Sequence, residues 1–217
     1  MATPKQIARR ERIEEAAYAV LKESGYKAAS LLAIARRASV SNETLYNWYG
    51  NKQGLFRSLI ESNAREAKEL LEGALQTGSD PLDTLAALGP ILLSLVTGDK
   101  AIVLNRAAAG DIGDTKTLGR AIAQFGRDTI APLVRNLLQA ASRSGLIVCG
   151  DPAATADIYF RLLIGDLQVR RVIGAIGELP PSEIERRASE AMALFLQLHA
   201  PAGGVRSLPP AHRRPSG

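Results

Sequence analysis

The sequence predicts an all-α protein with a small N-terminal three-helix domain and a larger helical body. Apolar residues recur at three- and four-residue steps along most of the chain. Ser, Asp or Pro stands before these periodic stretches, and Gly follows many of them. A chain of 217 residues is long enough for one small and one larger domain. We therefore expect domains at residues 1–57 and 58–199, and a disordered tail at 200–217 that is rich in Pro, Gly and Arg.

The first helices are short and closely spaced. An apolar stripe in the first helix stops at Ser24-Gly25, and Ser30 can cap a second helix over 31–38. Ser39-Val40 is a tight connection to a third helix. A helix followed by two short helices around such a turn is the helix-turn-helix arrangement, in which the second short helix enters the DNA major groove. The stripe consists of Ile13, Ala16, Ala17, Val20 and Leu21.

The third helix has the side chains of a reading helix. Ser41 can cap it, Leu45 and Trp48-Tyr49 supply apolar anchors at helical spacing, and Gly50 stops it. Its outer side then carries Asn42, Thr44, Tyr46 and Asn47. Hydrogen-bonding groups on a rigid element suit base edges and phosphates. The alternative is an ordinary surface helix of a helical bundle.

Positive charge is concentrated at the N-terminal end. Residues 1–57 hold ten Lys/Arg against five Asp/Glu, whereas residues 58–198 hold fourteen against seventeen. This distribution indicates a polyanionic partner at one end of the molecule, although a solvated charged surface is the simpler alternative.

Two further groups are placed to contact phosphates. Lys5, Arg9, Arg10 and Arg12 precede the first apolar turn and can form an arm along the DNA, or simply a frayed terminus. Lys52 begins a fourth helix, where the helix dipole favours an anion. The predicted DNA contacts are Arg9, Arg10, Ser30, Ser41, Asn42, Thr44, Tyr46, Asn47 and Lys52.

A set of small, apolar and polar residues recurs through the first three helices and the start of the fourth: Ala16-Ala17, Gly25-Tyr26, Ser30, Ile34-Ala35, Ala38, Val40-Ser41, Thr44-Leu45-Tyr46, Tyr49, Lys52 and Leu55-Phe56. In these features residues 7–57 resemble the DNA-binding domain of the tetracycline-repressor (TetR) family of bacterial regulators. Ser39 stands where Gly is usual in that family, and Glu43 replaces a frequent Gly or Pro. The stretch ETLYNWYGNKQGLF at residues 43–56 resembles the AefR-like subgroup.

The body is expected to begin with a lever helix from Lys52 to about Gln76, which joins the two domains. Gly89-Pro90 predicts a kink, Pro132 a bend, and Leu146–Cys149 a short extended connection. Further helices are expected over residues 82–96, 100–109, 115–143 and 152–173, with a last helix that starts at a Ser182/Glu185 capping box and ends near 198.

The helix at 152–173 and the last helix are apolar on more than one side. They can pair with their copies in a second subunit as a four-helix bundle, or they can complete the core of a single chain. The resemblance implies the first arrangement, a homodimer, and Phe195→Glu would test it, provided that Phe195 lies in the seam between the subunits.

The resemblance also implies a ligand-controlled switch. In TetR-like proteins a small molecule enters among the middle helices and tilts the fourth helix, which changes the separation of the two reading helices. Asp166 is one candidate for the pocket of that small molecule, but it could instead form an ordinary i,i+4 ion pair with Arg170 on the helix surface. The candidate pocket residues are Asn105, Arg106, Gln124, Phe125, Asp128, Arg161 and Asp166.

The residues give no support for an enzyme. The sequence has no Gly-rich phosphate loop, no His-Glu-x-x-His pair and no Gly-x-Ser-x-Gly elbow, and its two histidines, His199 and His212, lie near the end. We therefore expect no catalytic residue, no bound metal and no cofactor. A single cysteine, Cys149, and the lack of a membrane-spanning run favour a cytoplasmic protein with no membrane partner.

These observations together predict a sequence-specific DNA-binding transcriptional regulator. The expected form is a homodimeric repressor, released from a palindromic double-stranded operator by a small-molecule effector. One alternative is a helical small-molecule-binding protein or enzyme that has lost DNA binding. Another is a nonspecific DNA-packaging protein, which would need basic charge along the whole chain.

Overall fold

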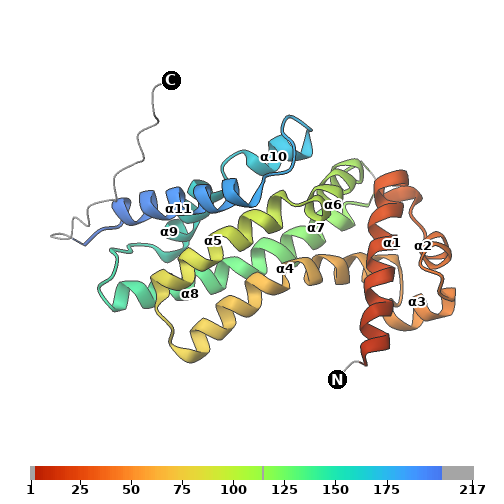
Figure 1. The fold of residues 1–217 in the computed structure, drawn as a ribbon, viewed down its shortest axis with the longest axis horizontal. Coiled ribbons are helices and arrows are strands. Elements are labelled where there is room, and N and C mark those ends of the chain that lie inside the picture. Colours follow the sequence, from red (N-terminus) through yellow and green to blue (C-terminus); the bar gives the residue numbers. More distant parts are fainter. Residues whose placement is uncertain (1–2, 114, 202–217) are drawn as a thin grey trace.

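The computed structural model describes residues 3–113 and 115–201. The described part is helical and contains no β-strand. Three helices form a compact group at one end of the molecule, and a fourth leads from them into the body (Figure 1). These helices are α1 (Pro4–Ala28), α2 (Leu31–Arg37), α3 (Asn42–Tyr49) and α4 (Lys52–Thr77). We call α1–α3 with the first two turns of α4 the reading module.

The body extends away from the reading module (Figure 1). In it, α5 and α8 run alongside α4, and α11 lies on the side of α5 that faces away from α4. Its segments are α5 (Pro81–Thr97), α6 (Asp99–Gly110), α7 (Thr117–Ile122), a π-helical turn η1 (Ala123–Arg127), α8 (Asp128–Arg143), α9 (Pro152–Ile164), α10 (Leu167–Val172) and α11 (Pro181–Leu198).

The buried apolar residues form two clusters. One fills the body between α4, α5, α8, α9 and α11, around the fully buried Leu85 and Phe195. The other fills the reading module, and it also includes Leu104, Ala107 and Leu118 of α6 and α7. Since body residues complete the core of the reading module, α6 and α7 link the two parts by direct packing.

The helix-turn-helix expected at residues 31–49 is confirmed. Each of its helices begins at a serine whose hydroxyl accepts a backbone N–H, from Ala33 to Ser30 at 3.1 Å and from Thr44 to Ser41 at 3.2 Å. Gly50 ends α3 with φ 75°, a conformation that glycine adopts without steric cost. The helix from Lys52 also runs as expected, to Thr77.

The alternative of a frayed N-terminus is wrong, because α1 begins at Pro4 and includes Lys5, Arg9, Arg10 and Arg12. Thr3 and Gln6 form a capping box. The Thr3 N–H donates to the Gln6 side chain at 2.8 Å, and the Gln6 N–H donates to the Thr3 hydroxyl at 3.3 Å. This box starts the helix before the first apolar turn.

The single helix expected over 152–173 is also wrong. It breaks at Gly165, which has φ 51° and ψ −128°, and a short α10 follows. The break turns the chain so that Leu167 and Arg171 are both buried. Helical periodicity continues across the break and therefore gives no sign of it.

Two more boundaries differ from expectation. The helix expected from 115 begins at Thr117 and contains the π turn at 123–127. The last helix begins at Pro181 after Pro180, without the Ser182/Glu185 capping box. Proline suits the first helical position without a cap, because it has no N–H to be satisfied there and its φ is already helical.

No single helix of the described chain is long and apolar enough to cross a membrane; α5 and α6 meet the criterion only as a pair, and they are bent by 49°. The segment 146–149 lies outside the helices, and the Val148 N–H donates to the His199 carbonyl at 2.8 Å. The tail expected to be disordered falls, from residue 202, outside the described residues.

Candidate nucleic-acid interface

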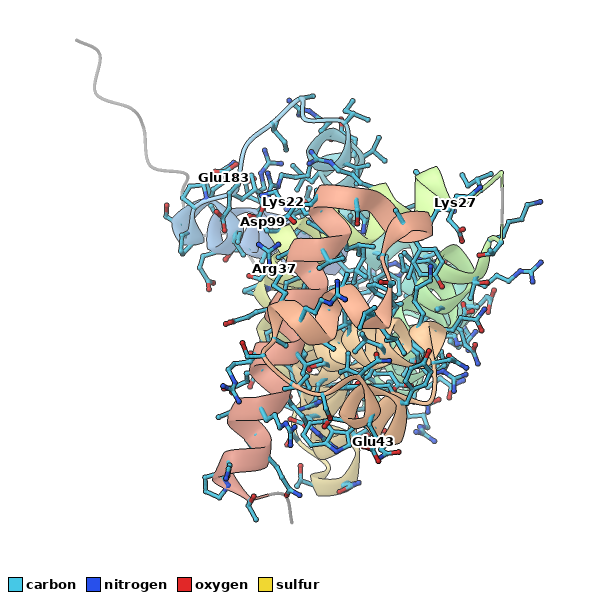
Figure 2. The ribbon with its side chains drawn as sticks, turned by 90° about the vertical axis from the view of Figure 1, so that its right-hand side faces the viewer. Lys22, Lys27, Arg37, Glu43, Asp99 and Glu183 are labelled. Carbon is cyan, nitrogen blue, oxygen red and sulfur yellow. The ribbon has the colours of Figure 1, made fainter. Side chains whose placement is uncertain are left out.

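The reading helix α3 is anchored on one side and free on the other. Leu45 is fully buried, whereas Tyr46 is 52% exposed and Asn47 is also exposed. Figure 2 looks onto the reading module, where Glu43 extends from α3 at the edge of the molecule. The exposed side therefore offers a phenol, an amide and a carboxylate, groups that can donate to or accept from bases and phosphates.

The N-terminal part of α1 packs against α3. Arg9 donates from Nη2 to the Thr44 hydroxyl at 2.9 Å, and the hydroxyls of Thr44 and Ser41 lie 2.8 Å apart. The predicted contacts Arg9, Thr44 and Ser41 thus form one network. The network holds the first turn of α3 against α1, and it engages Arg9 and Thr44, which the sequence interpretation had assigned to DNA alone.

Trp48 is the platform for two cations. The guanidinium carbon of Arg9 lies 5.4 Å from the centre of the Trp48 ring, and that of Arg10 lies 5.8 Å away. Contacts of this kind are worth about 0.5–1 kcal/mol at exposed sites and restrict the arginines without neutralising them. Two positive charges are therefore held beside the exposed side of α3.

Asn42 lies in the first turn of α3 and is half-buried. Its side-chain oxygen Oδ1 is buried without a hydrogen-bond partner, which is a cost to the folded protein.

Lys52 is held in a different environment from the one expected. Its ammonium donates to the carbonyl of Tyr26 at 2.8 Å and to that of Lys27 at 3.3 Å, and it lies 4.3 Å from the centre of the Tyr26 ring. It therefore caps the end of α1. The N-terminus of α4 is capped by Asn51, which accepts from the Gly54 N–H at 2.8 Å.

Ser30 and Tyr49 complete the surroundings of α3. The Ser30 hydroxyl is exposed at the start of α2, where it remains able to donate a hydrogen bond. Burial raises the pKa of Tyr49; the Glu14 carboxylate raises it further and Arg10 opposes this. Tyr49 is therefore a neutral group at the end of α3.

The seven candidates for an effector pocket are not brought together. Asn105 donates to the Ala101 carbonyl of its own helix at 2.8 Å, and Arg106 donates across to Val172 at 2.7 Å and Arg171 at 3.0 Å. Gln124 and Phe125 line one cavity, between α4, α7 and η1. The remaining candidates are exposed at separate positions: Asp128, Arg161 and Asp166.

Sequence reasoning missed two buried polar groups. Asp111 is 2% exposed and accepts from Thr115, Thr117 and Leu118 at the start of α7. Arg171 is 7% exposed and donates to the Thr97 carbonyl at 2.9 Å. No local pattern separated these two groups from ordinary surface charges.

The matches to known families agree with this arrangement. Residues 13–59 match the bacterial regulatory proteins of the tetR family, and residues 83–201 match the C-terminal domain of AefR-like transcriptional repressors. The second match alone spans more than half of the chain. The chain belongs to the TetR family.

Individual bacterial regulators resemble most of the chain. YvkB, an HTH-type transcriptional regulator of Bacillus subtilis, is 26% identical over 155 residues, which cover 71% of this chain and 79% of that protein. The structure of a TetR transcriptional regulator from Agrobacterium tumefaciens is 29% identical with a TM-score of 0.68, over 91% of this chain and 95% of that one.

A more distant relative was solved with a ligand. The structure of FadR from Bacillus subtilis in complex with stearoyl-CoA has a TM-score of 0.65 and 19% identity, over 85% of this chain and 96% of that one. Identity at this level shows a common fold. The family matches, with the helix-turn-helix, make this chain a TetR-family transcriptional regulator.

Proposed function

We propose that this protein is a homodimeric repressor that binds a palindromic operator through α3 and is released by a small-molecule effector. One observation carries the DNA-binding part of the proposal. The polar side of α3 is exposed beside two arginines that are held on Trp48 and lack a carboxylate partner among the described residues. Such a surface combines phosphate contacts with base contacts.

The proposed contacts divide into two classes. Arg9, Arg10 and Ser30 would position the module on phosphates, and Tyr46 and Asn47 would reach base edges or the backbone from the exposed side of α3. Asn42 would contact DNA from the first turn of α3, where its residue is half-buried. Ser41, Thr44 and Lys52 would act mainly by holding α3 in place, because their polar groups already bond within the protein.

The dimer is proposed to form through α9 and α11. Leu194 is 50% exposed and Leu198 is 64% exposed, four residues apart on one side of α11. A second subunit would remove this apolar surface from water. Phe195 is fully buried and packs on Tyr159 at 5.6 Å between ring centres, so the condition that it lies in the seam is not met.

The operator test selects bound duplexes from a random DNA library with the purified protein. We expect enrichment of an inverted repeat whose half-sites are spaced by about one helical turn, roughly 10 base pairs, or a multiple of it. Asn47→Ala should relax preference at defined base pairs, and Arg10→Ala should weaken binding to all sequences by about 1 kcal/mol.

Lys68→Ala is the matched control, because it removes a positive charge from an exposed site of α4 in the body. It should leave binding within about twofold, since exposed charges act weakly over such distances. If the library yields no enriched sequence, or if all three variants bind alike, α3 is not the reading element.

The dimer test replaces Leu194 and Leu198 together by Glu and measures mass by sedimentation equilibrium. We expect a dimer for the unchanged protein and a monomer for the double variant, because a dimer would have to bury four carboxylates. A variant that remains dimeric with unchanged affinity would place the interface elsewhere. Far-ultraviolet circular dichroism separates this result from unfolding.

An enzyme or a carrier that has lost DNA binding is the second class of function. No group of three or more His, Cys, Asp or Glu residues is placed to bind a metal ion in the described residues, and this observation does not favour a metalloenzyme. The intact α3 surface favours the regulator. We propose that the protein has no enzymatic activity of its own.

A further inference from the structure

A cavity of about 440 Å³ lies where the reading module meets the body. Its walls come from the end of α3, the first turns of α4, and α7 with the π turn η1. This volume is within the usual range for small-molecule sites. We propose that this cavity binds a small aromatic carboxylate, and that the bound anion weakens operator binding; the regulatory part of this inference rests on the proposed function.

The charges of the cavity select an anion. Arg57 and Arg120 both line it, and no acidic residue does. Neither arginine has a carboxylate partner within residues 3–113 and 115–201. Gln53 lies in the first turn of α4, where the helix dipole adds to the attraction. Guanidinium groups bind carboxylates through two parallel hydrogen bonds, so a carboxylate matches this wall.

The remaining walls favour a flat apolar body. The guanidinium carbon of Arg57 lies 4.6 Å from the centre of the Phe125 ring, which fixes the arginine against an aromatic surface. Tyr49 contributes a second ring, and Asn51 and Gln124 contribute amides to the lining. An aromatic carboxylate can stack on the rings while its charged end meets the arginines.

The π turn is an independent sign of a binding site. It spans Ala123–Arg127 and supplies Gln124 and Phe125 to the cavity. Turns of this kind are less stable than the α-helix and are found frequently at functional sites. Here the turn aims Phe125 at Arg57. Gln124 and Phe125 are the two sequence-predicted pocket residues that share a cavity.

The position of the cavity couples it to DNA. Gly54 allows the carbonyl of Tyr49 to approach α4 so closely that a Cβ would collide with it, so the end of α3 and the start of α4 move together. A ligand that bridges this unit to α7 would fix its angle to the body. Its charge would also offset Arg57 and Arg120 at the basic end of the molecule, which lowers the attraction for DNA.

The test titrates the full chain with 2-naphthoate and with its neutral isostere 2-naphthamide by calorimetry. We expect naphthoate to bind at least about tenfold more tightly than the amide, and Arg120→Gln to weaken naphthoate binding by about tenfold. Phe125→Leu should weaken both probes. Arg65→Gln, which removes an exposed arginine of α4 outside the cavity, is the control and should leave binding unchanged.

Operator affinity is then measured with and without saturating naphthoate. We expect the unchanged protein to lose at least fivefold affinity, and Arg120→Gln to lose less than twofold at the same concentration. By linkage, operator DNA should weaken naphthoate binding by the same factor. Operator binding without the probe tests the proposed function separately.

Three results would overturn the inference. One is equal binding of naphthoate to the unchanged protein and to Arg120→Gln. Another is displacement of naphthoate by inorganic phosphate as effectively as by benzoate at equal ionic strength, which would show recognition of charge alone. The third is tight naphthoate binding that leaves operator affinity unchanged, which would remove the regulatory role.

Discussion

The reading module and the body are held together by different kinds of contact. In the module every helix begins at a side chain that accepts a nearby backbone N–H, supplied by Thr3, Ser30, Ser41 and Asn51. In the body, the N-cap residue supplies such a bond only at α5 and α9 of the described helices, as Asp80 and Asp151. At α7 the bonds come from Asp111, which lies several residues before the helix. The segments whose own N-cap residue makes no such bond are α6, α7, η1, α8, α10 and α11.

The body uses contacts between distant parts of the chain instead. The Tyr159 hydroxyl donates to the Leu85 carbonyl at 2.8 Å, and Arg171 reaches both Thr97 and Asp99. Arg106 of α6 in turn donates to the carbonyls of Arg171 and Val172 at the end of α10. Local signals therefore specify the module, whereas the helix boundaries of the body depend on the tertiary fold. In the body, a single side chain can therefore hold two or more helices in place, and its loss should have a large effect on stability.

Arg171→Ala should have the largest effect on the free energy of unfolding, a loss of about 3 kcal/mol. Arg171 is nearly buried, and its loss leaves the Thr97 carbonyl without its donor and removes the side-chain bonds from α10 to Thr97 and Asp99. Urea unfolding measures the change. Arg170→Ala, at the exposed neighbouring position, should change the free energy by less than about 0.5 kcal/mol.

Equal effects of the two substitutions would contradict the assignment of a structural role to Arg171. Arg171→Lys sharpens the result. An ammonium can bond either Thr97 or Asp99, but it lacks the planar fork that reaches both at once. We therefore expect an intermediate loss, and a full recovery would show that charge alone is required.

Asp111→Asn should cost about 2 kcal/mol, because the buried carboxylate accepts from Thr115, Thr117 and Leu118 and an amide can donate where donors already point. Burial alone would raise the pKa of Asp111, but these hydrogen bonds outweigh it and hold the pKa below the usual 3.8. The lowered pKa means that the carboxylate stabilises the fold above about pH 4 and that this contribution is lost as the pH falls through the folded-state pKa.

The measurement compares the unfolding of Asp111→Asn and of the unchanged protein at pH 7 and at pH 3. The difference between them should shrink at the lower pH. Asp166→Asn is the control, since Asp166 is exposed and its side chain makes no capping hydrogen bond at the start of α10. A difference that stays constant with pH would show that the carboxylate charge does not contribute.

The same contrast explains how much of the fold could be predicted from the sequence. Ser30, Ser41 and Gly50 are local start and stop signals, and α2 and α3 lie where those signals place them. Gly165 lies inside an unbroken apolar pattern, and only the burial of Leu167 and Arg171 explains why the chain turns there. Helical periodicity reports which side of a helix is apolar, and it carries no information on where tertiary contacts interrupt the helix.

The candidate interface shows the same limit. The exposed positions Tyr46 and Asn47 follow from the helical spacing of Leu45 and Trp48, and the structure places both on the outer side. The inward bonds of Lys52 and Thr44 could not be predicted, because their partners Tyr26 and Arg9 lie 26 and 35 residues away. A polar residue at a helix start has the same sequence pattern whether it bonds DNA or the protein.

The smallest expected effect concerns two residues in left-handed conformation, one in each part of the molecule. Ser39 has φ 53° at the turn between α2 and α3, and Lys116 has φ 57° before α7. This conformation costs a non-glycine residue about 1–2 kcal/mol, of which the greater flexibility of glycine in the unfolded chain offsets about 0.5–1 kcal/mol. Ser39→Gly and Lys116→Gly should therefore each stabilise the protein by about 0.5–1 kcal/mol.

Ser39→Ala is the control for both substitutions, because alanine retains the Cβ and should give no gain. Thermal unfolding then shows whether the reading module and the body unfold together or separately. Because Leu104, Ala107 and Leu118 complete the core of the module, we expect module and body to unfold together, and either glycine should shift one common transition. If Ser39→Gly shifts an early transition and Lys116→Gly a later one, the module unfolds on its own, and the packing of α6 and α7 against it is too weak to make the two parts cooperative.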